Sequence, residues 1–278
     1  MPAVGNTLYP GVLLIPGSGA ADMNETLAKN VKPFWQISQY LSERGFVVLR
    51  YDKRGIGANS TIIDHNLWGN MTIYNLIHDA DTALDVLIRQ PEVDSKNITI
   101  IGHSEGTIIA PRLAISKPTN VKNIVLMDAV AQDFLGLARF QYIDLPIKYI
   151  KQKNTGSVPI QDVLPIFQKD PAYKQVLLGV SPYVTGHVRI DQQLKPLLER
   201  TFEKLYQNLT GGTQAECLNP KEGCPIYFNS EANLKPVLNI VGNIPNSTGI
   251  LILSGKNDIQ TPVEQALLLQ QRLTAPSS

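Results

Sequence analysis

Residues 98–106 read Ile-Thr-Ile-Ile-Gly-His-Ser-Glu-Gly and contain the pattern Gly102-x-Ser104-x-Gly106. A β-branched run ends at Gly102, and the residues after Gly106 have the spacing of a helix. A serine in this setting lies on a tight strand-to-helix turn, where its hydroxyl group is exposed at the end of a sheet. The two glycines suit the turn because it brings backbone against backbone and leaves no room for a side chain.

Strands and helices alternate on both sides of this turn. The predicted strands are short, nearly continuous apolar runs, which are typical of a parallel sheet covered by helices on both faces. They lie at 12–15, 46–51, 98–101, 124–127 and 250–254, and the predicted helices lie at 34–42, 72–90, 107–116 and 263–273. The fold class predicted is therefore α/β, with a mostly parallel sheet.

The alternation stops for over a hundred residues after the strand at 124–127. Helical patterns at 135–149, 163–178 and 192–209 occupy this stretch, with Pro and Gly between them. A long insert between two core strands is typical of a functional lid. We expect an α/β core of residues 1–130 and 246–278 and a mostly helical cap of residues 131–245. The alternative is an accessory domain with no role in the site.

Composition excludes several classes of partner. The 278 residues contain 25 Lys and Arg against 24 Asp and Glu, so a nucleic acid or an anionic membrane has no electrostatic support as a partner. No apolar run approaches the roughly 18 residues that span a bilayer. The first residues also lack the basic and long apolar regions of a signal peptide.

The only two cysteines, Cys217 and Cys224, lie in a loop rich in Pro, Gly and Asn. They predict either a local disulfide or two surface thiols, and no second Cys or His pair lies near enough to predict a zinc site. Six Asn-x-Ser/Thr triplets begin at Asn24, Asn59, Asn70, Asn97, Asn208 and Asn246. Together, the triplets and the disulfide favour an extracytoplasmic location.

A serine nucleophile needs a base, a group that orients the base, and donors for the oxyanion that develops. We predict Ser104 as the nucleophile and the backbone N–H of Glu105 as one oxyanion donor. The second donor is expected in Gly17-Ser18-Gly19, after the first strand. There the N–H of Ser18 is favoured, with that of Gly19 next.

Asp258 is the predicted catalytic acid. It follows the last strand, at the sheet edge where sites of open α/β sheets form, and it comes after Ser104 in the chain. Asp128, just past the preceding strand, is the alternative acid. A helix cap or a solvated loop carboxylate is the non-catalytic interpretation of either residue.

At four motifs the chain resembles the α/β-hydrolase superfamily. It is most similar there to the group of esterases, acyl-thioester hydrolases and serine aminopeptidase-like enzymes. The motifs are Leu-Ile-Pro-Gly-Ser-Gly at 14–19, Tyr-Asp-Lys-Arg-Gly-Ile-Gly at 51–57, Gly-His-Ser-Glu-Gly at 102–106, and Gly-Lys-Asn-Asp-Ile-Gln-Thr-Pro at 255–262. The resemblance implies the α/β-hydrolase fold and a Ser–Asp–His triad that cleaves an acyl bond through an acyl-enzyme.

The resemblance implies no cofactor and no metal. We expect an esterase for small-molecule acyl esters; the motifs leave the acyl group and the oligomeric state open. A thioesterase or an aminopeptidase is the alternative within enzymes, because all three share one tetrahedral intermediate. A non-catalytic binding protein of the same fold is the other alternative.

The chain departs from the family at both ends. The family's histidine follows the acid, but no histidine follows His187 here, and the family's first pair of strands is also missing. The chain therefore reads as truncated at both ends, and we expect an exposed sheet edge that makes it poorly stable or prone to associate. His103 is interpreted as structural, whereas His65, His78 and His187 are alternative bases. Asp52 and Arg54 are expected to hold the loop after their strand.

Overall fold

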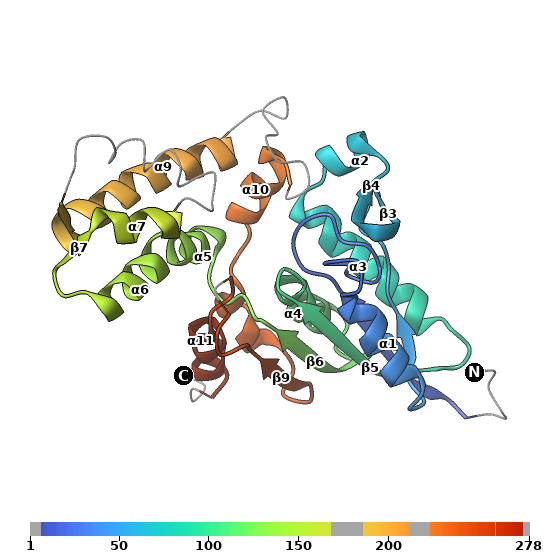
Figure 1. Cartoon of the computed structure of the whole chain (residues 1–278). Coiled ribbons are helices and arrows are strands. Elements are labelled where there is room, and N and C mark those ends of the chain that lie inside the picture. The colour runs from blue at the N-terminus through green and yellow to red at the C-terminus, as the bar shows by residue number, and fades with distance from the viewer. Residues whose placement is uncertain (1–6, 168–185, 212–222, 259, 275–278) are drawn as a thin grey trace. The chain divides into compact units, whose positions relative to one another are not determined.

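The computed structural model describes residues 7–167, 186–211, 223–258 and 260–274. The chain divides into two compact units, drawn in Figure 1: unit 1 comprises Met1–Asp133 and Thr213–Ser278, and unit 2 comprises Phe134–Gly212. The sequence predicts an insert at 131–245, whereas unit 2 ends earlier, at Gly212. In the described part of the chain, every helix is too short or too polar to cross a membrane.

Unit 1 is built on a parallel sheet. In its described part the strand order is β2-β1-β5-β6-β9. The strands are β1 (Tyr9–Ile15), β2 (Val47–Leu49), β5 (Val93–His103), β6 (Val121–Met127) and β9 (Gly249–Leu253). Each predicted strand is present, and the parallel pairing confirms the predicted α/β class.

Helices cover both faces of this sheet, which explains the apolar strands. They are α1 (Pro33–Ser42), α3 (Ile73–Ile88), α4 (Gly106–Ser116) and α11 (Val263–Thr274). Phe34 of α1 packs with Val12 and Leu14 of β1 on one face. Helices α3 and α4 pack on the other face and against each other. The core strands are thus buried on both sides, as continuous apolar runs predict.

The strand register brings four loops to one edge of the sheet. Ile15 at the end of β1 pairs with Gly102 of β5, and His103 pairs with Met127 of β6. Met127 in turn pairs with Leu253 of β9. The loops that follow β1, β5, β6 and β9 therefore begin side by side, at the carboxyl ends of the strands.

Strand β9 is an edge strand of the sheet, and part of it is exposed. Leu251 and Leu253 are 52% and 46% exposed, on the face of the sheet that also carries α1. An edge strand presents unpaired backbone groups, and here it also presents two apolar side chains. Whether the chain associates through this edge stays a prediction.

The periodicity of the sequence missed several short elements of unit 1. These are β3 (Ile56–Gly57) and β4 (Thr61–Ile62), which form a small antiparallel hairpin, and the helices α2 (His65–Gly69) and α10 (Pro225–Ala232). Elements of two to eight residues are shorter than the windows in which periodicity becomes visible. Cys224, the residue before α10, is disulfide-bonded, and Cys217 lies outside the described residues.

Unit 2 has its own small core. Helical residues run from α5 (Phe134–Arg139) through a π-helical turn to α6 (Leu145–Lys153), and α7 (Ile160–Phe167) and α9 (Lys195–Gly211) follow. The strands β7 (Ser157–Pro159) and β8 (His187–Arg189), which lie before and after α7 in the chain, pair antiparallel. The predicted helices at 135–149 and 192–209 are present, and that at 163–178 lies partly outside the described residues. The role of unit 2 as a cap stays a prediction.

Candidate active site

Ser104 has a left-handed backbone conformation, with φ of +50°. It lies between the end of β5 and the start of α4, and a non-glycine residue rarely adopts this conformation. A Cβ atom on Gly102 would lie 2.3 Å from the carbonyl oxygen of Gly106, and one on Gly106 would lie 2.2 Å from that of Ile15. Neither position therefore accommodates a side chain, so the turn requires both glycines.

Hydrogen bonds fix this turn to its neighbours. The backbone N–H of Ser104 donates to the carbonyl of Met127, at 2.9 Å. The hydroxyl of Thr107 donates to the carbonyl of Ser104, at 2.6 Å, and accepts the N–H of Val130, at 2.9 Å. Within the described residues, the Ser104 hydroxyl itself forms no hydrogen bond and is partly exposed. The backbone is rigidly held, and the hydroxyl is left available.

The loop after β1 lies directly against the serine. A Cβ atom on Gly17 would lie 3.2 Å from Cβ of Ser104. The N–H of Gly17 donates to Oε1 of Glu25, at 2.7 Å, so it is not free to bind a substrate. In contrast, none of the described residues accepts a hydrogen bond from the N–H of Ser18 or of Glu105. This arrangement suits both predicted oxyanion donors, whose role stays a prediction.

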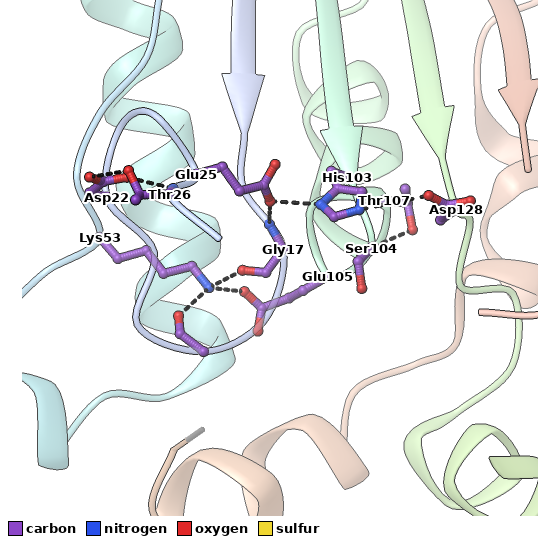
Figure 2. A network of polar contacts seen from close by, with 11 residues as sticks. Gly17, Asp22, Glu25, Thr26, Lys53, His103, Ser104, Glu105, Thr107 and Asp128 are labelled. Carbon is purple, nitrogen blue, oxygen red and sulfur yellow. Dashed lines mark hydrogen bonds and ion pairs between the residues drawn. The ribbon is translucent and has the colours of Figure 1, made fainter. Parts of the chain in front are cut away.

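His103 is held by carboxylates on both sides of its ring. Its Nδ1 lies 2.7 Å from Oε1 of Glu25, and its Nε2 lies 3.7 Å from Oδ2 of Asp128. Figure 2 shows the ring directed at Glu25 and the Ser104 hydroxyl pointing away from it. Burial lowers the pKa of His103, but the hydrogen bond and the charge of Glu25, together with the charges of Asp128 and Asp258, raise it more, so the net shift is upward. A structural role, as predicted, agrees with this geometry.

A buried polar cluster lies beneath the turn (Figure 2). The ammonium group of Lys53 donates to the carbonyls of Gly17 (2.6 Å) and Gly19 (3.2 Å) and to Oε1 of Glu105 (2.7 Å). Lys53 is 3% exposed and Glu105 is 1% exposed. The hydroxyl of Tyr227, from α10, donates to the other carboxylate oxygen of Glu105.

The charge of this cluster affects its neighbours. Burial raises the pKa of Glu231 to about 8, with a further contribution from the charge of Glu105. Burial, followed by the charge of Glu105, also raises the pKa of Tyr227 well above its ordinary value. At neutral pH the ion pair of Lys53 and Glu105 therefore lies beside two neutral groups, the Glu231 carboxyl and the Tyr227 hydroxyl.

The two acid candidates lie together. Oδ1 of Asp258 accepts the N–H groups of Gln260 (2.7 Å) and Thr261 (3.0 Å), and its Oδ2 accepts the Thr261 hydroxyl (2.9 Å). Burial raises the pKa of Asp258, but these hydrogen bonds and one with the Asp128 carboxyl group lower it more. Asp128 also accepts the N–H of Gly255, at 3.0 Å. The geometry therefore places both acids at the same edge of the sheet and does not separate them.

Among the described residues of unit 1, the other two histidines show no contact with these groups. His65 begins α2 and His78 lies in α3, both with exposed side chains, and His187 lies in unit 2. Within the described ranges, no cluster of three or more His, Cys, Asp or Glu side chains is placed to hold a metal ion.

Asp52 and Arg54 hold loops, as expected. Asp52 accepts the N–H of Met23, at 2.7 Å. Arg54 forms a bidentate pair with Asp79 of α3, with N–O distances of 2.8 and 2.6 Å. Neither contact involves Ser104.

A family model described as the alpha/beta hydrolase fold matches residues 10–243, which is most of the chain. The chain belongs to the alpha/beta hydrolase fold family. The family match confirms the fold predicted from the four motifs, and its matched range includes the turn at Ser104, the loop at Gly17 and the cluster around Lys53.

A relative of this alpha/beta hydrolase is named as an esterase. It is 34% identical to Esterase EstD of Thermotoga maritima over 111 residues, which are 40% of this chain and 25% of the esterase. The match thus spans about a quarter of that protein's length. Family membership and the name of this relative support a hydrolase.

Two solved structures share the fold at low identity. Alpha/beta hydrolase GrgF from Penicillium sp. sh18 is 16% identical, with a TM-score of 0.54 over 97% of this chain and 79% of that one. MGS-M2, an alpha/beta hydrolase enzyme from a Medee basin deep-sea metagenome library, is 18% identical, with a TM-score of 0.51 over 99% and 80%. At these identities the likeness shows the fold alone.

Sequence reasoning missed three residues that shape the site of this alpha/beta hydrolase: Glu25, Lys53 and Tyr227. Lys53 lies inside a motif that was recognised, between Asp52 and Arg54, but charged side chains after a strand are usually solvated. Glu25 and Tyr227 lie in segments without periodic pattern, and nothing in the sequence places them near residue 104.

Proposed function

We propose that this alpha/beta hydrolase is a serine hydrolase that cleaves carboxylic esters through an acyl-enzyme, with Ser104 as the nucleophile. One observation carries the proposal. Ser104 is held in a left-handed conformation on a strand-to-helix turn, between two glycines that cannot be replaced. Backbone strain of this kind is concentrated at functional sites, and this turn exposes a nucleophilic hydroxyl.

In the proposed reaction, Oγ of Ser104 attacks the acyl carbonyl carbon and loses its proton to a base. The carbonyl oxygen becomes an oxyanion, which the N–H groups of Glu105 and Ser18 stabilise. Collapse of the tetrahedral intermediate breaks the bond to the alcohol, which leaves with a proton. Water then repeats the sequence on the acyl-enzyme and releases the acid.

Asp258 is proposed as the acid that orients the base. Its carboxylate is held by Gln260 and Thr261, and its pKa is lowered, so it is ionised at neutral pH. Among the described residues, no histidine forms a hydrogen bond with Asp258 or with the Ser104 hydroxyl. We therefore assign the nucleophile and the acid, and assign no residue to the base.

An ester substrate is proposed because the family match and the esterase-named relative point to that class. A small-molecule ester fits a site built from backbone N–H donors and one hydroxyl. The net charge of +1 agrees with this. Thioester and amide bonds pass through the same intermediate, so relative rates decide between these substrates.

The test is hydrolysis of p-nitrophenyl butyrate, together with labelling by a fluorophosphonate probe. We expect turnover and labelling in the native protein, and neither in Ser104→Ala. Ser116→Ala is the matched control, because Ser116 lies at the opposite end of α4 and its hydroxyl only donates to the carbonyl of Leu113. A native protein that is not labelled at Ser104 contradicts the proposal and favours a non-catalytic binding protein.

A further inference from the structure

We infer that Lys53 is the positioning residue of the oxyanion hole, because its one ammonium group holds both of the segments that supply the N–H donors. The inference rests on the proposed function. Lys53 touches the loop that carries Ser18 at two carbonyls, and it touches the side chain of Glu105, the residue that supplies the other N–H. The ammonium group has three donors, and all three are used in this way.

The contact with Gly17 fixes the direction of the Ser18 N–H. The carbonyl of Gly17 and the N–H of Ser18 belong to one peptide group, and in a trans peptide they point in opposite directions. Because Lys53 binds that carbonyl at 2.6 Å, the N–H of Ser18 must face away from Lys53. A second bond, to the carbonyl of Gly19 at 3.2 Å, holds the peptide group that follows Gly19.

The peptide group between Pro16 and Gly17 is held by Glu25. The N–H of Gly17 donates to Glu25 at 2.7 Å, so this group is turned away from the site. Glu25 thus occupies the N–H of Gly17, and Lys53 fixes the direction of the N–H of Ser18. Figure 2 shows both residues converging on the loop.

The contact with Glu105 ties this loop to the nucleophile turn. The ion pair is 2.7 Å long and nearly completely buried, and Tyr227 holds the second oxygen of the carboxylate. Burying an ammonium group is costly unless it is paired and hydrogen-bonded. If Lys53 served only to pack the loop, an apolar side chain could therefore replace it. Here the charge reaches three acceptors that an apolar side chain cannot bind.

The experiment compares ester hydrolysis by Glu105→Gln and by the double variant Lys53→Met/Glu105→Gln. In Glu105→Gln, the Lys53 ammonium group keeps the carbonyls of Gly17 and Gly19 and gains the new amide oxygen as acceptors, so its charge stays hydrogen-bonded. The double variant removes both charges of the pair, whereas Lys53→Met alone leaves the Glu105 carboxylate buried without a cation. Relative to Glu105→Gln, we expect kcat to fall about 100-fold, as when one oxyanion donor is lost, with KM changed less than about threefold.

Two further measurements separate positioning from folding. A trifluoromethyl ketone forms a tetrahedral adduct with a serine, so its affinity should fall in parallel with kcat, whereas the melting temperature should match that of Glu105→Gln. Lys117→Met is the control for loss of an ion pair. Lys117 follows the end of α4 that is opposite to Ser104, and it binds Asp81 and Asp85. Its replacement should leave the activity unchanged.

A folded double variant with kcat and ketone affinity within about threefold of Glu105→Gln overturns the inference and leaves the proposed function intact. A native protein that neither hydrolyses the ester nor binds the ketone instead refutes the proposed function, and the role of Lys53 falls with it.

Discussion

Gly106 touches the backbone of β1, and a methyl group there has no space. A Cβ atom would lie 2.2 Å from the carbonyl oxygen of Ile15, which belongs to a buried strand and cannot move aside. We therefore expect Gly106→Ala to lower the free energy of unfolding by about 2–3 kcal/mol, the cost of overpacking, and to abolish labelling of Ser104.

Urea denaturation measures this change, with Gly242→Ala as the control. Gly242 is exposed, and a Cβ atom there would meet only the end of the Arg272 side chain, at 3.4 Å. Its replacement should change the free energy of unfolding by no more than about 0.5 kcal/mol. Equal effects of the two replacements would show that the turn does not need its glycine.

The pair of His103 and Glu25 should make stability depend on pH. The folded-state pKa of His103 lies above its ordinary value of 6.5, so the stabilisation from the pair is fully present below about pH 6.5 and is lost as the pH rises through the folded-state pKa. We expect Glu25→Gln to lower the pKa of His103, measured by NMR of the imidazole ring. It should also remove this part of the pH dependence from urea denaturation.

Asp128→Asn is the control for this titration. Its carboxylate lies 3.7 Å from Nε2, against 2.7 Å from Nδ1 for Glu25, so its removal should lower the pKa of His103 less. If Asp128→Asn had the larger effect, Asp128 and not Glu25 would be the main partner of the imidazole.

Elements with a long repeating pattern were predicted from the sequence, and short ones were not. Helix α3 has apolar residues at helical spacing over 16 residues, and Thr72 and Pro91 mark its ends. The hairpin of β3 and β4 consists of two-residue strands, which have no period to detect. The sequence places the residues of α10 in the insert, because no parallel strand is predicted between the strands at 124–127 and 250–254. Its packing against α3 in unit 1 is a tertiary contact that its own residues do not encode.

The start of α3 tests whether the residues at a helix end determine where the helix begins. The Thr72 hydroxyl accepts the N–H of Asn75, and the Asn75 side chain accepts the N–H of Thr72, which together form a capping box. Thr72→Ala should lower the free energy of unfolding by about 1 kcal/mol, as measured by urea denaturation. Thr82→Ala, at an exposed position inside the same helix, should change it by less than about 0.5 kcal/mol. A smaller loss at Thr72 than at Thr82 would mean that tertiary packing alone sets the start of α3.

At the scale of the whole molecule, the candidate site combines loops that are distant in the sequence. The Gly-x-Ser-x-Gly pattern locates the candidate nucleophile because the turn itself demands those residues over five positions. The residues around it, Glu25, Lys53 and Tyr227, are brought in by the sheet order and by α10, so no local pattern reveals them. The turn and the candidate residues on it could therefore be predicted from the sequence, whereas the residues that surround the turn required the fold.

The division into two units predicts separate responses to core mutations. Ile190 is completely buried in the cluster of unit 2, whereas Leu84 is completely buried in unit 1. Either residue replaced by alanine should cost about 2–5 kcal/mol locally, because a cavity is left in a closely packed core. Compact parts of a protein can open as separate cooperative units. Hydrogen exchange should therefore accelerate in α9 and the paired strands β7 and β8 for Ile190→Ala, and in β1, β5 and β6 for Leu84→Ala. Acceleration of both units by either variant would show instead that the chain unfolds as one cooperative body.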